Sequence, residues 1–210
     1  GADNGLGVAA IMAVLESKDI SHPKIEALFT IDEETGMTGA LNLSNSILTG
    51  NILLNLDTEE DDEICIGCAG GVDITMHRDY KLVDPSEDEI FVRVLLNGLT
   101  GGHSGAEIHK GLGNSNKILF EIIAGINSIF QIKIVDINGG GLRNAIPRES
   151  SLTLCFSKSH LDEFNDYIKK SSIQYSGKFV KTDPNFNLES ENLDIIVPSL
   201  SNSDTVDLIT

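Results

Sequence analysis

Residues 25–36 read Ile-Glu-Ala-Leu-Phe-Thr-Ile-Asp-Glu-Glu-Thr-Gly, an apolar run that ends directly in acidic side chains. A second apolar run, residues 52–56, is followed at once by Asp57. Short runs of this kind are typical of buried strands in an α/β sheet. Because ligands of such sheets bind beyond the carboxyl ends of the strands, we expect these acids to converge on one crevice. Converging carboxylates repel one another unless a metal ion or a proton joins them, so a metal site is the leading hypothesis.

The overall composition narrows the class of protein. The 210 residues carry a formal charge of -17, and 40% of them are hydrophobic, which is enough for a folded core in one or two domains. The acidic excess argues against nucleic acid, which needs clustered Lys and Arg, and against anionic membrane surfaces. The longest apolar run, residues 8–15, is too short to span a bilayer. A cytoplasmic protein with no membrane partner is expected.

The cysteines do not indicate a redox or structural site. There are three of them, and an odd number argues against a disulfide framework. Cys65 and Cys68 form a C-x-x-C, but they flank a strand-like segment, whereas a redox pair of this spacing normally opens a helix. We interpret both as buried apolar side chains.

The first third of the chain has the pattern of an α/β domain. We predict a helix over residues 5–17, a strand ending at residue 31, a short helix over 36–43 and a strand over 51–56. The glycine-rich residues 67–71 are expected to form a hinge, followed by an antiparallel strand over 72–80. The fold class is therefore α/β, with one domain over residues 1–69 and a second over residues 70–210.

The second domain shows a different order of elements. The patterns predict strands and helices in the order β-α-β-β-α-β, over residues 90–97, 113–127, 130–137, 149–157, 161–171 and, weakly, 178–181. This is the split βαβ arrangement of ferredoxin-like domains. Ser203 and Asp204 are expected to cap a last helix, and the sequence ends within the first two turns of that helix. Because so short a helix is marginal, we expect the chain to be cut from a longer one.

The acidic side chains could have different chemical roles. Side chains of Glu33 and Glu34 point in different directions at the end of a strand, so one can bind a metal while the other takes a proton from water. Asp3 could bridge two metal ions or simply cap the following helix, and Asp57 could be a terminal ligand. A solvated pair of glutamates remains the alternative at positions 33 and 34. No histidine lies close to these acids in sequence, and an all-carboxylate site would favour magnesium or calcium over zinc.

Two glycine-rich segments carry further candidate residues. Residues 98–105, Gly-Leu-Thr-Gly-Gly-His-Ser-Gly, present His103 on a loop whose glycines would let the backbone approach a ligand. In residues 138–147, Arg143 offers a fork for a substrate carboxylate, and Asn144 supplies both a donor and an acceptor. A mobile loop with an exposed histidine and a turn with a surface arginine are the plainer interpretations.

Seven motifs, taken in order, resemble the co-catalytic zinc metallopeptidases that include carboxypeptidase G, acetylornithine deacetylase and succinyl-diaminopimelate desuccinylase. The likeness runs from residue 1 to about residue 160 and is strongest to the aminoacyl-histidine (Xaa-His, cytosolic non-specific) dipeptidase branch. The motifs are Gly-Ala-Asp-Asn-Gly (1–5), Asp-Glu-Glu-Thr-Gly-Met (32–37), Leu-Asp-Thr-Glu-Glu (56–60), Gly-Cys-Ala-Gly-Gly (67–71), Gly-Gly-His-Ser-Gly (101–105), Gly-Leu-Gly-Asn-Ser-Asn-Lys (111–117) and Leu-Arg-Asn-Ala-Ile-Pro-Arg-Glu (142–149).

This resemblance implies zinc-dependent hydrolysis of dipeptides such as Xaa-His, with two Zn²⁺ ions, or Mn²⁺ or Co²⁺ in their place. It implies that Asp3 bridges the two ions, that Glu34 and Asp57 each bind one of them, and that Glu33 is the general base. Residues 1–69 would be part of the catalytic domain of the enzyme.

The resemblance also assigns roles to the second domain. Residues 70–210 would form the first half of a lid domain, in which His103 helps to stabilise the tetrahedral oxyanion. Arg143 and Asn144 would contact the terminal carboxylate or the backbone of a small peptide substrate. A homodimer is a possible assembly, because in relatives the lid histidine can come from a partner subunit.

The chain also departs from the pattern of the family. An upstream His-x-Asp and a late histidine ligand are not found in these residues, so the chain resembles an internal fragment that would be inactive by itself. Two other readings stay open. One is a deacylase of N-acyl amino acids with the same metal centre, and the other is an inactive remnant or binding module.

Overall fold

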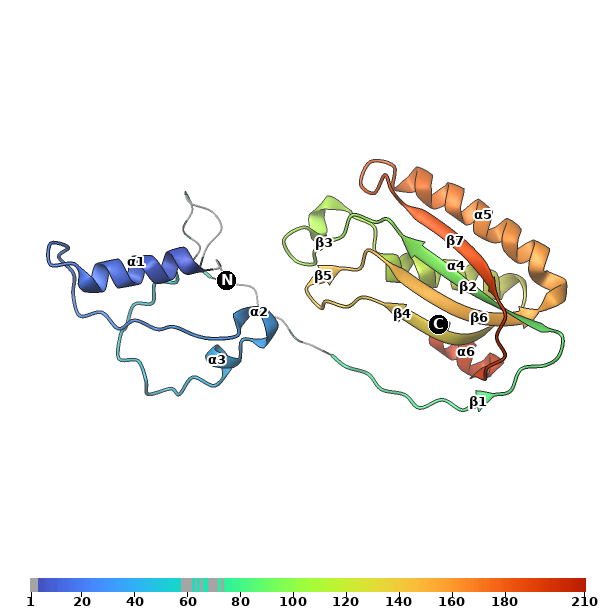
Figure 1. Ribbon diagram of the computed structural model, residues 1–210, viewed down its shortest axis with the longest axis horizontal. Coiled ribbons are helices and arrows are strands. Elements are labelled where there is room, and N and C mark those ends of the chain that lie inside the picture. Colours follow the sequence, from blue (N-terminus) through green and yellow to red (C-terminus); the bar gives the residue numbers. More distant parts are fainter. Residues whose placement is uncertain (1–3, 58–61, 63, 65, 68–71, 73) are drawn as a thin grey trace. The chain divides into compact units, whose positions relative to one another are not determined.

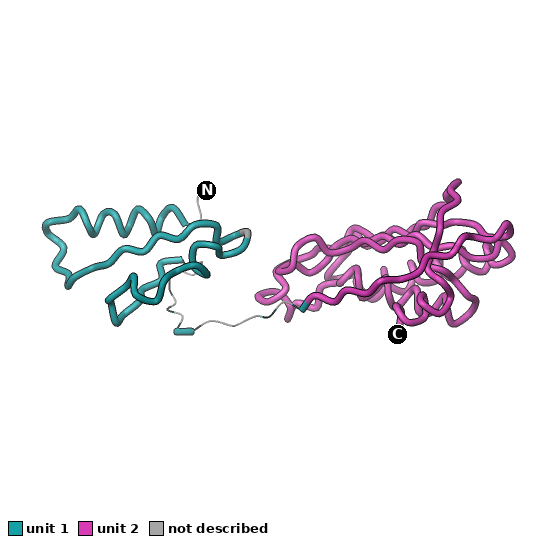
Figure 2. The backbone as a smooth tube through the Cα atoms, turned by 90° about the horizontal axis from the view of Figure 1, so that it is seen from below, with its two compact units in different colours: residues 1–74 teal, residues 75–210 magenta. Residues whose placement is uncertain are grey.

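The chain folds into two compact units, residues 1–74 and residues 75–210 (Figures 1 and 2). The computed structural model describes residues 4–57, 62, 64, 66, 67, 72 and 74–210. We call the two parts the N-terminal unit and the C-terminal unit. Within the described part of the chain, no helix is both long and apolar enough to cross a membrane.

The N-terminal unit begins with α1 (Gly5–Glu16), the helix predicted over residues 5–17. Asn4 caps it, because its Oδ1 accepts the N–H of Gly7 at 2.8 Å. Apolar side chains of α1 such as Leu6 (83% exposed) face solvent.

Two four-residue helices, α2 (Glu33–Gly36) and α3 (Thr38–Leu41), replace the single helix predicted over residues 36–43. The break falls at Met37, whose φ of 56° is left-handed. A left-handed residue cannot continue a right-handed helix, so the chain must start a second turn.

The two strands predicted over residues 25–31 and 51–56 are wrong: the structure assigns no strand to either stretch. The Glu26 carboxylate accepts the hydroxyl of Thr49 and the backbone N–H groups of Thr49 (2.7 Å) and Gly50 (3.3 Å). These contacts lower the pKa of Glu26 to about 2, chiefly through the bonds to Thr49. Apolar side chains that a sheet would bury are exposed, Ile52 by 84%.

The C-terminal unit is built on a four-stranded antiparallel sheet with the strand order β4-β6-β2-β7. The predicted β-α-β-β-α-β order is present. Its elements are β2 (Glu89–Asn97), α4 (Ser115–Ile129), β4 (Lys133–Gly139), β6 (Ser150–Ser157), α5 (Leu161–Lys178) and β7 (Asn187–Leu193).

The last strand was predicted in the wrong place. Residues 178–181 belong to the end of α5 and the turn after it, and the strand follows as β7. The helix continues because Ser171 and Tyr175 extend the buried stripe that starts at Phe164 and Ile168, with spacings of three and four residues.

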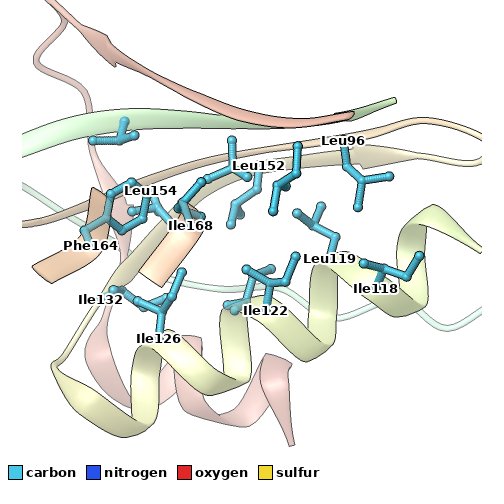
Figure 3. Close-up of a cluster of buried hydrophobic side chains, with 14 of the residues drawn as sticks. Leu96, Ile118, Leu119, Ile122, Ile126, Ile132, Leu152, Leu154, Phe164 and Ile168 are labelled. Atoms are coloured by element: carbon cyan, nitrogen blue, oxygen red, sulfur yellow. The ribbon is translucent and has the colours of Figure 1, made fainter. Parts of the chain in front are cut away.

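The core lies between the sheet and the helices α4 and α5. Alternate residues of β2 and β6, among them Leu96, Leu152 and Leu154, point toward the apolar side of α4, as Figure 3 shows. Ile122 and Ile126 of α4 are no more than 1% exposed. Burying each such side chain contributes about 1.5–3 kcal/mol, so this interface stabilises the unit.

The strand expected over residues 72–80 is also wrong for the residues that the structure describes there. Arg78 instead bonds Asp207 at 2.7 Å and lies over the ring of Tyr80, and these side-chain contacts hold the segment without a ladder. A short strand, β1 (Leu82–Val83), follows and pairs with β8 (Ser199–Leu200).

The final helix is α6 (Asn202–Ile209), and its cap is Ser201 rather than Ser203 or Asp204. Thr205 of this helix accepts the N–H of Ile134 on the edge strand β4 at 3.2 Å. The unit is completed by the short strands β3 (Gly102–His103) and β5 (Ala145–Ile146) and by the 3-10 turns η1 (Ile108–Lys110) and η2 (Lys158–His160).

Candidate functional site

Glu33 and Glu34 form the first turn of α2, and both side chains are exposed. The residue before them, Asp32, has a left-handed φ of 62°. Its carbonyl accepts the N–H of Met37 at 2.6 Å, and its carboxylate accepts the hydroxyl of Thr38. These two bonds explain how a residue with a side chain is held at positive φ, next to the two candidate carboxylates.

Asn4 joins the start of α1 to the segment that carries Asp57. While Oδ1 of Asn4 caps the helix, its Nδ2 donates to the carbonyl of Leu56 at 2.7 Å. Asp57 itself is exposed. Asp3 lies outside the described residues, and so do Cys65 and Cys68. From sequence Asn4 could be interpreted only as a cap, because its second bond spans 52 residues.

The donor set of the N-terminal unit suits a divalent cation in its chemistry. Glu33, Glu34 and Asp57 offer exposed carboxylate oxygens, the ligands of hard cations, while zinc generally takes nitrogen or sulfur as well. Within the described ranges, however, no three His, Cys, Asp or Glu side chains gather closely enough to hold a metal ion.

His103 lies beside the segment that carries Arg143 and Asn144. The strands β3 and β5 pair with His103 opposite Ala145, and the N–H of Ser104 donates to the carbonyl of Asn144 at 2.8 Å. All three candidate side chains are exposed. Two glycine-rich segments that the sequence singled out separately thus meet in one short ladder.

The hydrogen bonds around the His103 ring define its tautomer. The backbone N–H groups of Gly105 and Ala106 both donate to Nδ1, each at 3.0 Å. An atom that accepts two hydrogen bonds carries no proton, so a neutral ring must carry its proton on Nε2. His103 therefore offers an N–H donor, which is what a developing oxyanion needs.

Glu107 is a neighbour of His103 that sequence reasoning missed. One carboxylate oxygen accepts the N–H of His103 at 2.8 Å, and the other is 2.5 Å from the ammonium of Lys110. The bond to Lys110, followed by that to His103, lowers the pKa of Glu107. A Cβ at position 102 would lie 2.7 Å from Glu107, which explains the glycine there. The only indication in the sequence was the spacing of Glu107 and Lys110, which as an i,i+3 pair of opposite charge can form an ion pair.

Comparison with known proteins finds one matching family and relatives whose similarity extends over both units. Residues 94–172 match the family described as peptidase dimerisation domain. The chain is 41% identical over 204 residues to the cytosol non-specific dipeptidase of Escherichia coli, covering 96% of this chain and 40% of that protein. It is 30% identical over 115 residues to the uncharacterised protein YqjE of Bacillus subtilis, covering 53% of this chain and 26% of the relative.

A solved structure gives the same result. The aminoacylhistidine dipeptidase of Vibrio alginolyticus superposes with a TM-score of 0.77 at 34% identity, covering 100% of this chain and 43% of that one. The match of residues 94–172 to a peptidase dimerisation domain indicates a protein of the peptidase class. Residues 94–172 match the M20 dimerisation family, and the chain as a whole is similar to these dipeptidases. The predicted resemblance to the cytosol non-specific and aminoacylhistidine dipeptidases is confirmed, and the chain spans about 40% of their length.

Proposed function

We propose that the protein containing this chain is a zinc-dependent dipeptidase that hydrolyses dipeptides such as Xaa-His. The observation that carries the proposal is the 41% identity to a dipeptidase over almost the whole of this chain. In this proposal residues 1–69 are part of the catalytic domain, and residues 70–210 are the first half of the lid domain that covers the substrate.

The N-terminal unit would provide the acidic ligands and the base. Asp3, Glu34 and Asp57 would hold two Zn²⁺ ions, with Mn²⁺ or Co²⁺ as possible replacements. Bound zinc supplies Lewis acidity, which polarises the scissile carbonyl and acidifies the attacking water. Glu33, adjacent to the ligand Glu34 on the first turn of α2, takes the proton of that water and delivers it to the leaving amine.

The C-terminal unit would bind the substrate and its developing charge. The Nε2–H of His103 donates to the oxyanion, because Nδ1 is occupied by the N–H groups of Gly105 and Ala106. Arg143 and Asn144, next to His103 across the β3–β5 ladder, contact the terminal carboxylate or backbone of the dipeptide.

Assembly and location follow from the same relatives. We infer a homodimer, because residues 94–172 match a peptidase dimerisation domain. A cytoplasmic location is supported by the E. coli relative, whose name places it in the cytosol. Light scattering of the purified protein would measure its mass in solution, and a monomer would contradict the dimer.

The decisive experiment compares Glu33→Gln with Glu34→Gln in the complete enzyme. A base that is not a ligand can be neutralised without loss of metal, so Glu33→Gln should keep its zinc and lose at least about a hundredfold in kcat. Glu34→Gln should lose zinc as well as activity. Zinc content is measured by mass spectrometry of the metal, and kcat by release of histidine from an Xaa-His dipeptide.

Two results would contradict the proposal. Near-normal turnover in Glu33→Gln would remove that residue from the role of base. An unmodified enzyme that cleaves N-acyl amino acids but ignores dipeptides with a free amino group would be a deacylase instead.

A further inference from the structure

The loop that carries His103 begins and ends at one buried carboxylate. Oδ1 of Asp183 accepts the N–H of Thr100 at 2.8 Å, and Oδ2 accepts the N–H of Gly113 at 2.9 Å. Asp183 is 1% exposed and lies about 80 residues away in the sequence. A single side chain thus closes the base of the loop that runs between Thr100 and Gly113.

The chemistry of Asp183 is that of a fixed anchor. Burial by itself would raise the pKa of this carboxyl, but the N–H bonds from Thr100 and Gly113 hold its pKa below the ordinary value. The carboxylate therefore stays ionised at neutral pH, and hydrogen bonds to an ionised acceptor are stronger than those between neutral groups.

Further contacts join the same two segments. The hydroxyl of Thr100 donates to the carbonyl of Thr182 at 2.7 Å. Gly98, with a φ of 75°, approaches the carbonyl oxygen of Asn185 so closely that a Cβ would lie 1.9 Å from it. The base of the loop is therefore packed on residues 182–185 at several points, and Asp183 binds both ends.

The loop needs such an anchor because of its sequence. Between Thr100 and His103 lie Gly101 and Gly102, both at positive φ, and glycine gives the backbone wide freedom. Without a fixed point before the glycines, the position of β3 against β5 is poorly defined. Glu107 fixes the loop after His103, and Asp183 fixes it before.

We propose that Asp183 is a positioning residue for His103: by joining Thr100 to Gly113, it sets where the His103 ring stands beside Asn144. This inference rests on the oxyanion role proposed for His103. A misplacement of about 1 Å in a group that acts on the transition state can cost about a hundredfold in rate.

The test uses Asp183→Asn, which keeps the size of the side chain. Its amide NH₂ replaces one of the two acceptor oxygens, so a donor then lies against the N–H of Thr100 or of Gly113. The matched control is Thr205→Val, which also removes a buried side-chain acceptor of a backbone N–H, that of Ile134 near the start of β4. We expect Asp183→Asn to lower kcat of the complete enzyme at least about tenfold, with KM within about twofold. Thr205→Val should lose stability while keeping kcat.

A second readout does not depend on activity. Nitrogen-15 NMR of the ring in the complete enzyme reports the tautomer, and the unmodified enzyme should show an unprotonated Nδ1 at His103. In Asp183→Asn the Nδ1 signal should shift toward a mixture of tautomers, with faster amide exchange at Gly105 and Ala106. In Thr205→Val it should not move.

The outcomes separate the two proposals. A kcat of Asp183→Asn equal to that of Thr205→Val, or unchanged His103 nitrogen signals, would overturn the positioning role. An unmodified enzyme without dipeptidase activity would overturn the proposed function, and the NMR comparison would then decide the role of Asp183 by itself. If Asp183→Asn does not fold, Thr100→Val removes only the hydroxyl bond to Thr182 and should shift both readouts in the same direction by less.

Discussion

The ammonium of Lys133 lies 2.7 Å from the carboxylate of Glu89, and both side chains are largely buried, with exposed fractions of 15% and 10%. The backbone N–H of Ser86 donates to the same carboxylate at 3.0 Å. This ion pair joins the starts of β4 and β2, which are separated in the sheet by β6.

Lys133→Met should destabilise the C-terminal unit by about 3 kcal/mol, because it leaves the carboxylate of Glu89 buried without its cation. Urea denaturation measures the change. The double variant Lys133→Met with Glu89→Gln removes both charges and should recover most of the loss. A double variant as unstable as the single one would mean that the unpaired charge is not the cause.

The stability difference between the unmodified chain and Asp183→Asn should depend on pH. The folded pKa of Asp183 lies below its ordinary value of 3.8, so its stabilising contribution is complete above that value and is lost as the pH falls through the folded pKa. We expect a gap of about 2 kcal/mol at neutral pH that narrows in acid. Urea denaturation between about pH 7 and about pH 3 checks this, and a constant gap would contradict it.

Gly98→Ala should destabilise the chain by more than about 2 kcal/mol, because the new Cβ would meet the carbonyl oxygen of Asn185 at a φ of 75°. Gly111→Ala is the control, since Gly111 has a similar φ of 67° with nothing within 4 Å of the added Cβ. That variant should lose only about 1 kcal/mol from backbone strain. Equal losses in thermal denaturation would show that the contact with Asn185 is unimportant.

His103→Ala should lower kcat of the complete enzyme by about a hundred- to a thousandfold, the usual effect of removing one oxyanion donor. Zinc content should stay unchanged, because His103 is assigned no metal. His109→Ala, which removes an exposed histidine of the same loop, should keep full activity. Loss of zinc in His103→Ala would instead make His103 a metal ligand.

The ferredoxin-like order of the C-terminal unit could be predicted because its signals are local. Alternating apolar residues such as Val92, Val94 and Leu96 define a strand with one face in the core, whatever the rest of the chain does. The last strand was predicted in the wrong place because the buried stripe of α5 continues through Tyr175. The helix predicted over residues 161–171 was therefore too short.

The prediction of strands in the N-terminal unit was wrong for a different reason. An apolar run such as residues 52–56 indicates a preference for burial, but a strand also requires a ladder partner, and the structure pairs these residues with none. The contacts of Asn4 with Leu56 and of Asp183 with Thr100 link residues 52 and 83 positions apart. No local pattern encodes such contacts, so the candidate residues could be named but not the groups that position them.

The bond from Ile134 to Thr205 bears on how the sheet avoids unwanted assembly. An edge strand with free backbone donors is a template on which another chain can add a strand and start an aggregate. On β4 the helix α6 covers this edge and takes up the donor of Ile134. The opposite edge, β7, instead presents the exposed acid Glu189, while its Glu191 pairs with Arg93 of β2 at 3.4 Å. The two borders of one sheet are thus guarded against the addition of a further strand by different means, one by a covering helix and the other by exposed charged side chains.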